Sequence, residues 1–165
     1  MSVDTRDCAV AVTRRFDAPA ATIFAALCDP ANHVEFDGSG MLRSTVAGPL
    51  SGVGDSFVVE MWNPHMDDYE ITNVVVDFTP DRLIRWQPTL SRASRPEAAE
   101  RVGVSAKHRW GFALSPVGDG VTDVTETFDC IESPEWLQAA TKGGATWIEA
   151  MTTSLEKLAE LIDAT

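Results

Sequence analysis

The chain has 165 residues, 44% of them hydrophobic and 23% charged, which fits one globular domain large enough to bury a sizeable core. Its formal net charge of −12 argues against nucleic acid or an anionic membrane surface as a partner, because both repel an acidic protein. The sequence has no run of about eighteen apolar residues and no recognisable signal peptide, so we expect a cytoplasmic protein. Its three cysteines lack metal-ligand spacing, so we expect reduced thiols and no metal ion.

The N-terminal part predicts one strand, two short helical segments and a turn. Residues Cys8–Phe16 alternate in the manner of a strand. Asp17-Ala18-Pro19 opens a short helix, and Asp29-Pro30 ends it because the residue before proline disfavours the helical conformation. A second helical turn is expected around residues 31–35. Asp37-Gly38-Ser39-Gly40 then predicts a turn, since glycine adopts backbone conformations that other residues avoid.

Six further strands are expected before the C-terminal region, so the element order indicates an α+β domain. The polar stretch between Pro88 and Ser105 fits neither the strand nor the helix period and predicts a long mobile loop. Val117-Gly118-Asp119-Gly120 predicts a hairpin turn. The six expected strands are Met41–Val46, Asp55–Trp62, Tyr69–Phe78, Arg82–Gln87, Ala106–Leu114 and Thr122–Cys130.

The C-terminal region predicts one long amphipathic helix over about residues 134–163. Ser133-Pro134-Glu135 supplies an N-cap serine, a proline at the first helical position and an acid in the first turn. Gly143-Gly144 falls inside this helix, where each glycine costs about 1 kcal/mol relative to alanine. The pair is compatible with close approach to a strand, a kink, space for a ligand, or a helix that begins only after it. The apolar stripe is Leu137, Ala140, Gly144, Ile148, Met151, Leu155, Leu158 and Ile162.

Seven motifs along the chain carry a resemblance to a known family. They are Arg15-Phe16-Asp17-Ala18-Pro19, Asp37-Gly38-Ser39-Gly40-Met41, Gly52-Val53-Gly54-Asp55, Arg82-Leu83-Ile84-Arg85-Trp86, Trp110-Gly111-Phe112, Val124-Thr125-Glu126-Thr127-Phe128-Asp129-Cys130 and Trp147-Ile148-Glu149-Ala150-Met151. Together they resemble the SRPBCC superfamily, and in particular its actinobacterial polyketide cyclase/dehydrase-like branch, over roughly residues 9–162.

This resemblance implies a helix-grip fold: a seven-stranded antiparallel sheet wrapped around the C-terminal helix, with two short helices after the first strand. It implies a single domain over residues 1–165, with the sheet over about 8–130. The first and last strands pair in such a fold, so Cys8 and Cys130 are implied neighbours, and we expect both to be reduced. The superfamily includes pollen allergens, START lipid carriers, aromatase/cyclases and chaperone-ATPase activators, so it implies no single chemistry.

A set of aromatic residues and methionines, which includes Trp62 and Met66, predicts the lining of a cavity between sheet and helix. Any one of them is also compatible with simple core packing, but tryptophan is a large side chain and methionine packs adaptably around irregular shapes. The expected ligand-binding residues are Phe57, Val59, Met61, Tyr69, Ile71, Asn73, Trp86, His108, Trp110, Phe112, Glu126, Trp147 and Met151.

His108, Glu126 and Tyr69 are the candidate catalytic residues. Each lies on the apolar side of its strand, where burial would raise the pKa of a carboxyl group and lower that of an imidazole. Such groups suit proton transfer or ligand orientation. The alternative is that His108 and Glu126 lie near strand ends, reach water or hydrogen-bond one another, and that the Tyr69 hydroxyl reaches the rim.

The sequence leads to three hypotheses of function, none of which involves a cofactor. The first is binding of a small hydrophobic ligand, such as a lipid, a polyketide or an aromatic metabolite. The second is a polyketide aromatase/cyclase or dehydratase in which the candidate catalytic residues exchange protons with the substrate. The third is a protein-interaction module like the chaperone-ATPase activators, which predicts an exposed apolar patch and a tightly filled interior. The oligomeric state is not predicted.

Overall fold

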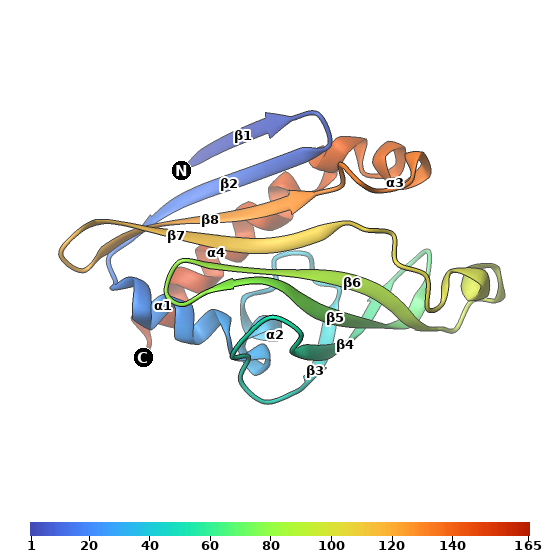
Figure 1. Ribbon diagram of the computed structural model, residues 1–165, viewed down its shortest axis with the longest axis horizontal. Helices are drawn as coiled ribbons and strands as arrows, with labels where there is room; N and C mark the ends of the chain where they lie inside the picture. Colours follow the sequence, from blue (N-terminus) through green and yellow to red (C-terminus); the bar gives the residue numbers. More distant parts are fainter.

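The computed structural model describes residues 1–165 and shows an eight-stranded antiparallel sheet with helices on one side (Figure 1). The strand order across the sheet is β1-β2-β8-β7-β6-β5-β4-β3. The strands are β1 Ser2–Arg6, β2 Ala9–Phe16, β3 Leu42–Val46, β4 Ser56–Asn63, β5 Asp67–Thr79, β6 Leu83–Ala93, β7 Arg109–Gly118 and β8 Val121–Asp129. The α-helices are α1 Ala20–Leu27, α2 His33–Phe36, α3 Glu135–Ala140 and α4 Ile148–Asp163, and the 3-10 helices are η1 Pro30–Asn32, η2 Pro96–Arg101 and η3 Lys142–Trp147.

The α+β helix-grip architecture is confirmed, with one strand more than the seven expected. The additional strand, β1, pairs with β2 at the edge of the sheet, from Ser2 opposite Thr13 to Arg6 opposite Ala9. All five of its residues are exposed. An edge strand without a buried face has no alternation of apolar and polar residues, and this explains why the sequence pattern does not predict it.

The core lies between the sheet and α4. Alternate residues of the strands face α4, because successive side chains of a strand point to opposite sides of the sheet. From α4, Leu155 and Leu158 are fully buried, and Met151 and Ile162 extend the same stripe. Helix α4 crosses β2 and β8, while α1 and α2 close one end of the sheet (Figure 1). No helix combines the length and the apolar character needed to cross a membrane.

The expected continuous helix over 134–163 is wrong in its middle. Helix α3 ends before Gly143 and Gly144, which have φ angles of +65° and +98°, and α4 begins only at Ile148. A methyl group on Gly144 would lie 2.8 Å from Cδ1 of Phe128, so the chain passes too close to β8 for any side chain. The glycine pair therefore provides both the kink and the close strand approach.

The expected mobile loop between Pro88 and Ser105 is also wrong over much of its length. Strand β6 continues to Ala93 in register with β5, and η2 follows with Ala98 fully buried. The polar residues of this stretch pair across the outer face of the sheet: Arg92 forms an ion pair with Glu60. Charged side chains on a solvated face hide the strand period, which explains the error.

The structure brings Cys8 and Cys130 to facing positions at the ends of β2 and β8. The backbone N–H of Cys130 donates to the carbonyl oxygen of Cys8 at 2.8 Å. All three cysteines are free thiols in the structure.

Candidate functional site

A cavity of about 660 Å³ lies between the sheet and the segment that runs from α3 to α4. Twenty of its 33 lining residues are hydrophobic. Every strand from β3 to β8 contributes to the wall, together with α2 and α4. A largely apolar pocket of this volume, with few polar groups, is the usual form of a small-molecule site.

All thirteen residues expected to bind a ligand line this cavity. They do so because the strand registers align their inward faces in adjacent rows. The cross-strand pairs among them are Phe57 with Asn73, Val59 with Ile71, Met61 with Tyr69, Trp86 with Trp110, and Phe112 with Glu126. The structure thus brings the predicted residues together, and their role in binding stays a prediction. Met66 also lines the cavity, whereas Trp62 is 38% exposed beneath the guanidinium of Arg43.

Glu126, on β8, is the most unusual polar group of the wall. It is 7% exposed, and its Oε2 atom has no hydrogen-bond partner. Burial raises the pKa of this carboxyl well above its usual value, and the nearby Asp37 carboxylate raises it further. The group is therefore held toward its protonated form, in which it can donate a hydrogen bond to an oxygen atom of a ligand.

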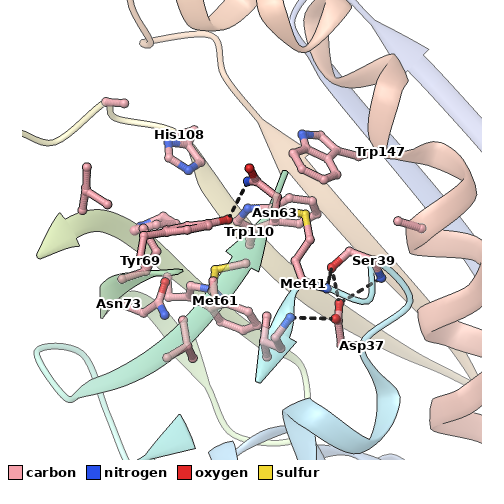
Figure 2. Close-up of a pocket in the computed structure, with 18 of the residues that line it drawn as sticks. Asp37, Ser39, Met41, Met61, Asn63, Tyr69, Asn73, His108, Trp110 and Trp147 are labelled. Carbon is pink, nitrogen blue, oxygen red and sulfur yellow. Dashed lines mark hydrogen bonds between the residues drawn. The ribbon is translucent and has the colours of Figure 1, made fainter. Parts of the chain in front are cut away.

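His108 lies just before β7 and lines the cavity together with Trp110 and Trp147, which Figure 2 also shows. Its ring centroid is 5.8 Å from that of Phe128, and its Nδ1 atom has no hydrogen-bond partner. Burial lowers the pKa of His108 to about 4, so the imidazole is neutral at neutral pH. The Nε1 atom of Trp147 is likewise buried without a partner.

Tyr69, on β5, presents its hydroxyl to the cavity. The Nδ2 atom of Asn63 donates to that hydroxyl at 3.2 Å, as Figure 2 shows, which leaves the hydroxyl proton free to be donated to a ligand. Burial raises the pKa of Tyr69 to about 12, and Asp37 acts in the same direction. Asn73 lies on the same face of β5 as Tyr69, is 3% exposed and also lines the wall.

Sequence reasoning missed His33 as a wall residue. His33 is 4% exposed, and its ring stacks on Trp86 with centroids 5.4 Å apart. Its Nε2 atom donates to the carbonyl oxygen of Leu27 at 2.8 Å, and burial lowers its pKa. Helix α2 has only four residues, too few for a periodic pattern to reveal which side faces inward.

The turn Asp37-Gly38-Ser39-Gly40 was predicted, but its place in the cavity wall was not. The N–H of Gly38 donates to Oγ of Ser154 at 2.8 Å, and a methyl group on Gly38 would lie 2.1 Å from the carbonyl oxygen of Ala150. This close packing against α4 brings the Asp37 carboxylate to the wall. The glycine-rich motif indicates that the backbone packs closely against another element, but it does not indicate that this element is α4.

Exposed lining residues, among them Val104 and Trp136, mark the mouth of the cavity. Arg101, at the end of η2, places its guanidinium 5.5 Å from the centre of the exposed Trp136 ring on α3 and donates to Sδ of Met66 at 3.5 Å. These contacts join η2, α3 and the β4–β5 turn around the opening. No group of three or more His, Cys, Asp or Glu side chains converges in a way that could hold a metal ion.

The fold and the cavity together define a helix-grip domain with a largely apolar internal cavity. The family model described as polyketide cyclase / dehydrase and lipid transport matches residues 7–163, and the chain belongs to this family. The expected relationship to SRPBCC-type proteins is therefore confirmed.

Relatives in sequence and in structure agree with this assignment. The Mycobacterium tuberculosis protein Rv0088 is 34% identical over 113 residues, which are 68% of this chain and 43% of that protein, so the chain spans less than half the length of this relative. Protein Ms6760 from Mycobacterium smegmatis has the same fold, with a TM-score of 0.72 and 17% identity over 99% of this chain and 98% of that one. DynU16, a protein in the dynemicin biosynthetic locus, matches with a TM-score of 0.60 and 19% identity over 96% of this chain and 48% of its own.

Proposed function

We propose that this protein binds a small hydrophobic ligand, such as a polyketide, a lipid or an aromatic metabolite, in the cavity between the sheet and α4. The observation that carries the proposal is a 660 Å³ cavity with a mainly apolar lining that also contains Glu126, a buried carboxyl group without a partner for Oε2. A buried polar group left unpaired costs about 1–3 kcal/mol. A ligand that supplies the missing hydrogen bond offsets this cost.

Family membership supports the same reading, because the description of the family names polyketide chemistry and lipid transport. DynU16, which shares the fold, comes from a biosynthetic locus. The protein-interaction hypothesis predicts a tightly filled interior, and the cavity gives it no support.

Polyketide cyclase or dehydratase activity is the second candidate function, and one observation favours it. Glu126 and His108 line the same cavity, and burial shifts their pKa values in opposite directions. A protonated carboxyl can donate its proton to a substrate carbonyl oxygen, and a neutral imidazole can accept one from carbon or a hydroxyl. If this chemistry occurs, Glu126→Gln abolishes turnover while substrate still binds. Unchanged turnover would leave the cavity a binding site only.

Native mass spectrometry of freshly purified protein tests the proposed binding. We expect a small molecule that leaves on denaturation, or binding of added N-phenylnaphthylamine, an uncharged dye that fluoresces in apolar sites. Ala106→Trp places a large ring in the cavity wall, so we expect it to abolish both signals. Ala139→Trp, at an exposed position of α3 outside the wall, is the matched control. Dye binding that survives Ala106→Trp would place the site elsewhere and refute the proposal.

A further inference from the structure

We propose that the cavity selects uncharged ligands over anionic ones: the bound ligand places a carbonyl or hydroxyl oxygen against Glu126, and ligands that carry a carboxylate or a phosphate are rejected. This inference rests on the proposed function and narrows it, because many lipids carry such an anionic group. It follows from the charges around the cavity and from the unpaired carboxyl group on its wall.

The interior wall contains no cation that could pair with an anionic ligand. Arg101 is the only lysine or arginine among the lining residues, and it lies at the mouth, over Trp136 and against Met66. The two interior histidines, His33 and His108, are both neutral at neutral pH, because burial disfavours their charged form.

The one carboxylate of the interior wall makes the site unfavourable for anions. Asp37 accepts hydrogen bonds at its Oδ1 atom from the N–H and the hydroxyl of Ser39, at 3.0 and 2.7 Å, and at Oδ2 from the N–H of Leu42 at 3.1 Å. These three bonds fix the position of the carboxylate on the wall. Its negative field reaches both Glu126 and Tyr69, whose pKa values it raises. An anionic ligand would meet the same field in a site of low dielectric constant.

The neutral groups of the wall complement a ligand that carries oxygen atoms. The protonated carboxyl of Glu126 and the hydroxyl of Tyr69 are both donors, and the amide of Asn73 offers a donor and an acceptor. The aromatic rings between them, Trp86 and Phe112, have centroids 6.0 Å apart and provide flat apolar surfaces. An uncharged ring system with oxygen substituents fits this arrangement better than a chain with an acidic head group.

Displacement of N-phenylnaphthylamine by a matched pair of compounds tests the inference. The pair is a hydroxynaphthoic acid, with its two groups at opposite ends of the ring system, and its methyl ester, which has the same rings without the charge. At neutral pH we expect the carboxylate to bind at least about tenfold more weakly than the ester, because its charge enters the cavity unpaired. Equal or tighter binding of the carboxylate would overturn the inference.

Variants of Glu126 test whether binding of the ester depends on a hydrogen bond from this side chain. Glu126→Gln keeps an uncharged hydrogen-bond donor of similar shape, so we expect the ester to bind within about threefold of its original affinity, whereas Glu126→Leu weakens it by about fivefold through the lost hydrogen bond. Glu60→Gln, on the outer face of β4, removes a charge outside the cavity and is the control for net charge. Equal ester affinity in all three variants would exclude contact between the ligand and Glu126.

The two proposals fail in distinguishable ways. If the dye does not bind, or binds equally well to Ala106→Trp, the cavity is not a ligand site and both proposals fall. If the dye binds in the cavity but neither naphthalene compound displaces it, or the acid displaces it as well as the ester, only the ligand class is wrong.

Discussion

His108→Gln should make the protein less sensitive to mild acid. Partial burial, which removes water from around the ring, lowers the pKa of the His108 imidazole in the folded protein from an ordinary value of 6.5 to about 4. As the pH falls from 6.5 toward 4, the unfolded chain binds a proton that the folded chain does not. The free energy of unfolding therefore falls with pH over this window, and glutamine, which does not titrate, removes that part of the loss.

The size of the effect follows from the two pKa values. At about pH 5 the unfolded imidazole is almost fully protonated and the folded one is mostly neutral, which lowers the free energy of unfolding by about 2 kcal/mol. At about pH 7.5 the same difference is close to zero. The stability difference between His108→Gln and the wild type should thus move by about 2 kcal/mol in favour of the variant between these two pH values.

Urea unfolding followed by tryptophan fluorescence measures this change. His33 has a lowered pKa as well, but it is present in both proteins, so its contribution cancels in the difference. His65→Gln, at an exposed position in the β4–β5 turn, controls for the loss of an imidazole. A wild-type and variant difference that stays constant between the two pH values would refute the burial of His108 as a neutral group.

Two further predictions concern the C-terminal segment and the thiols. Gly144→Ala should lower the free energy of unfolding by about 2–4 kcal/mol, because its methyl group would meet Phe128 and the residue has a positive φ angle. The control is Gly40→Ala, which also has a positive φ angle but has no atom within 4 Å of the new methyl group, and it should cost about 1 kcal/mol. Equal losses for the two variants in urea unfolding would contradict the close packing at Gly144. Thiol titration of the unfolded protein without reductant should give three free cysteines, and a value of one would show that Cys8 and Cys130 are bonded.

Much of the cavity wall could be predicted from the sequence, because strands encode their faces in a period of two. Phe57, Val59 and Met61 alternate with more polar residues, and the structure places all three on the inner wall. Glu126 was identifiable for the same reason, as a carboxyl group on the apolar side of its strand. Once the long helix is expected to cover one face of the sheet, this side is also the side of the cavity.

The parts of the wall that could not be predicted depend on tertiary packing. His33 reaches the cavity because its short helix is placed beside Phe57 and Trp86, whose ring centroids lie 5.2 and 5.4 Å from its own. Asp37 reaches it because Gly38 packs against α4. Neither contact has a local pattern in the sequence. The left-handed backbone at Gly143 and Gly144 is likewise determined by contact with β8, since glycine is compatible with both a helix and a break.

The break at Gly143 and Gly144 gives the two halves of the C-terminal segment different tasks. Beyond it, Leu155 and Leu158 of α4 are fully buried in the core, and Met151 on the same helix also faces the cavity. Before it, α3 contributes no buried residue and instead places Trp136 at the mouth. A continuous helix would couple the position of the mouth to the packing of the core, because a rigid rod moves as one body. With the break, α3 and η2 contribute residues to the opening, while α4 packs against the sheet and forms part of the inner wall.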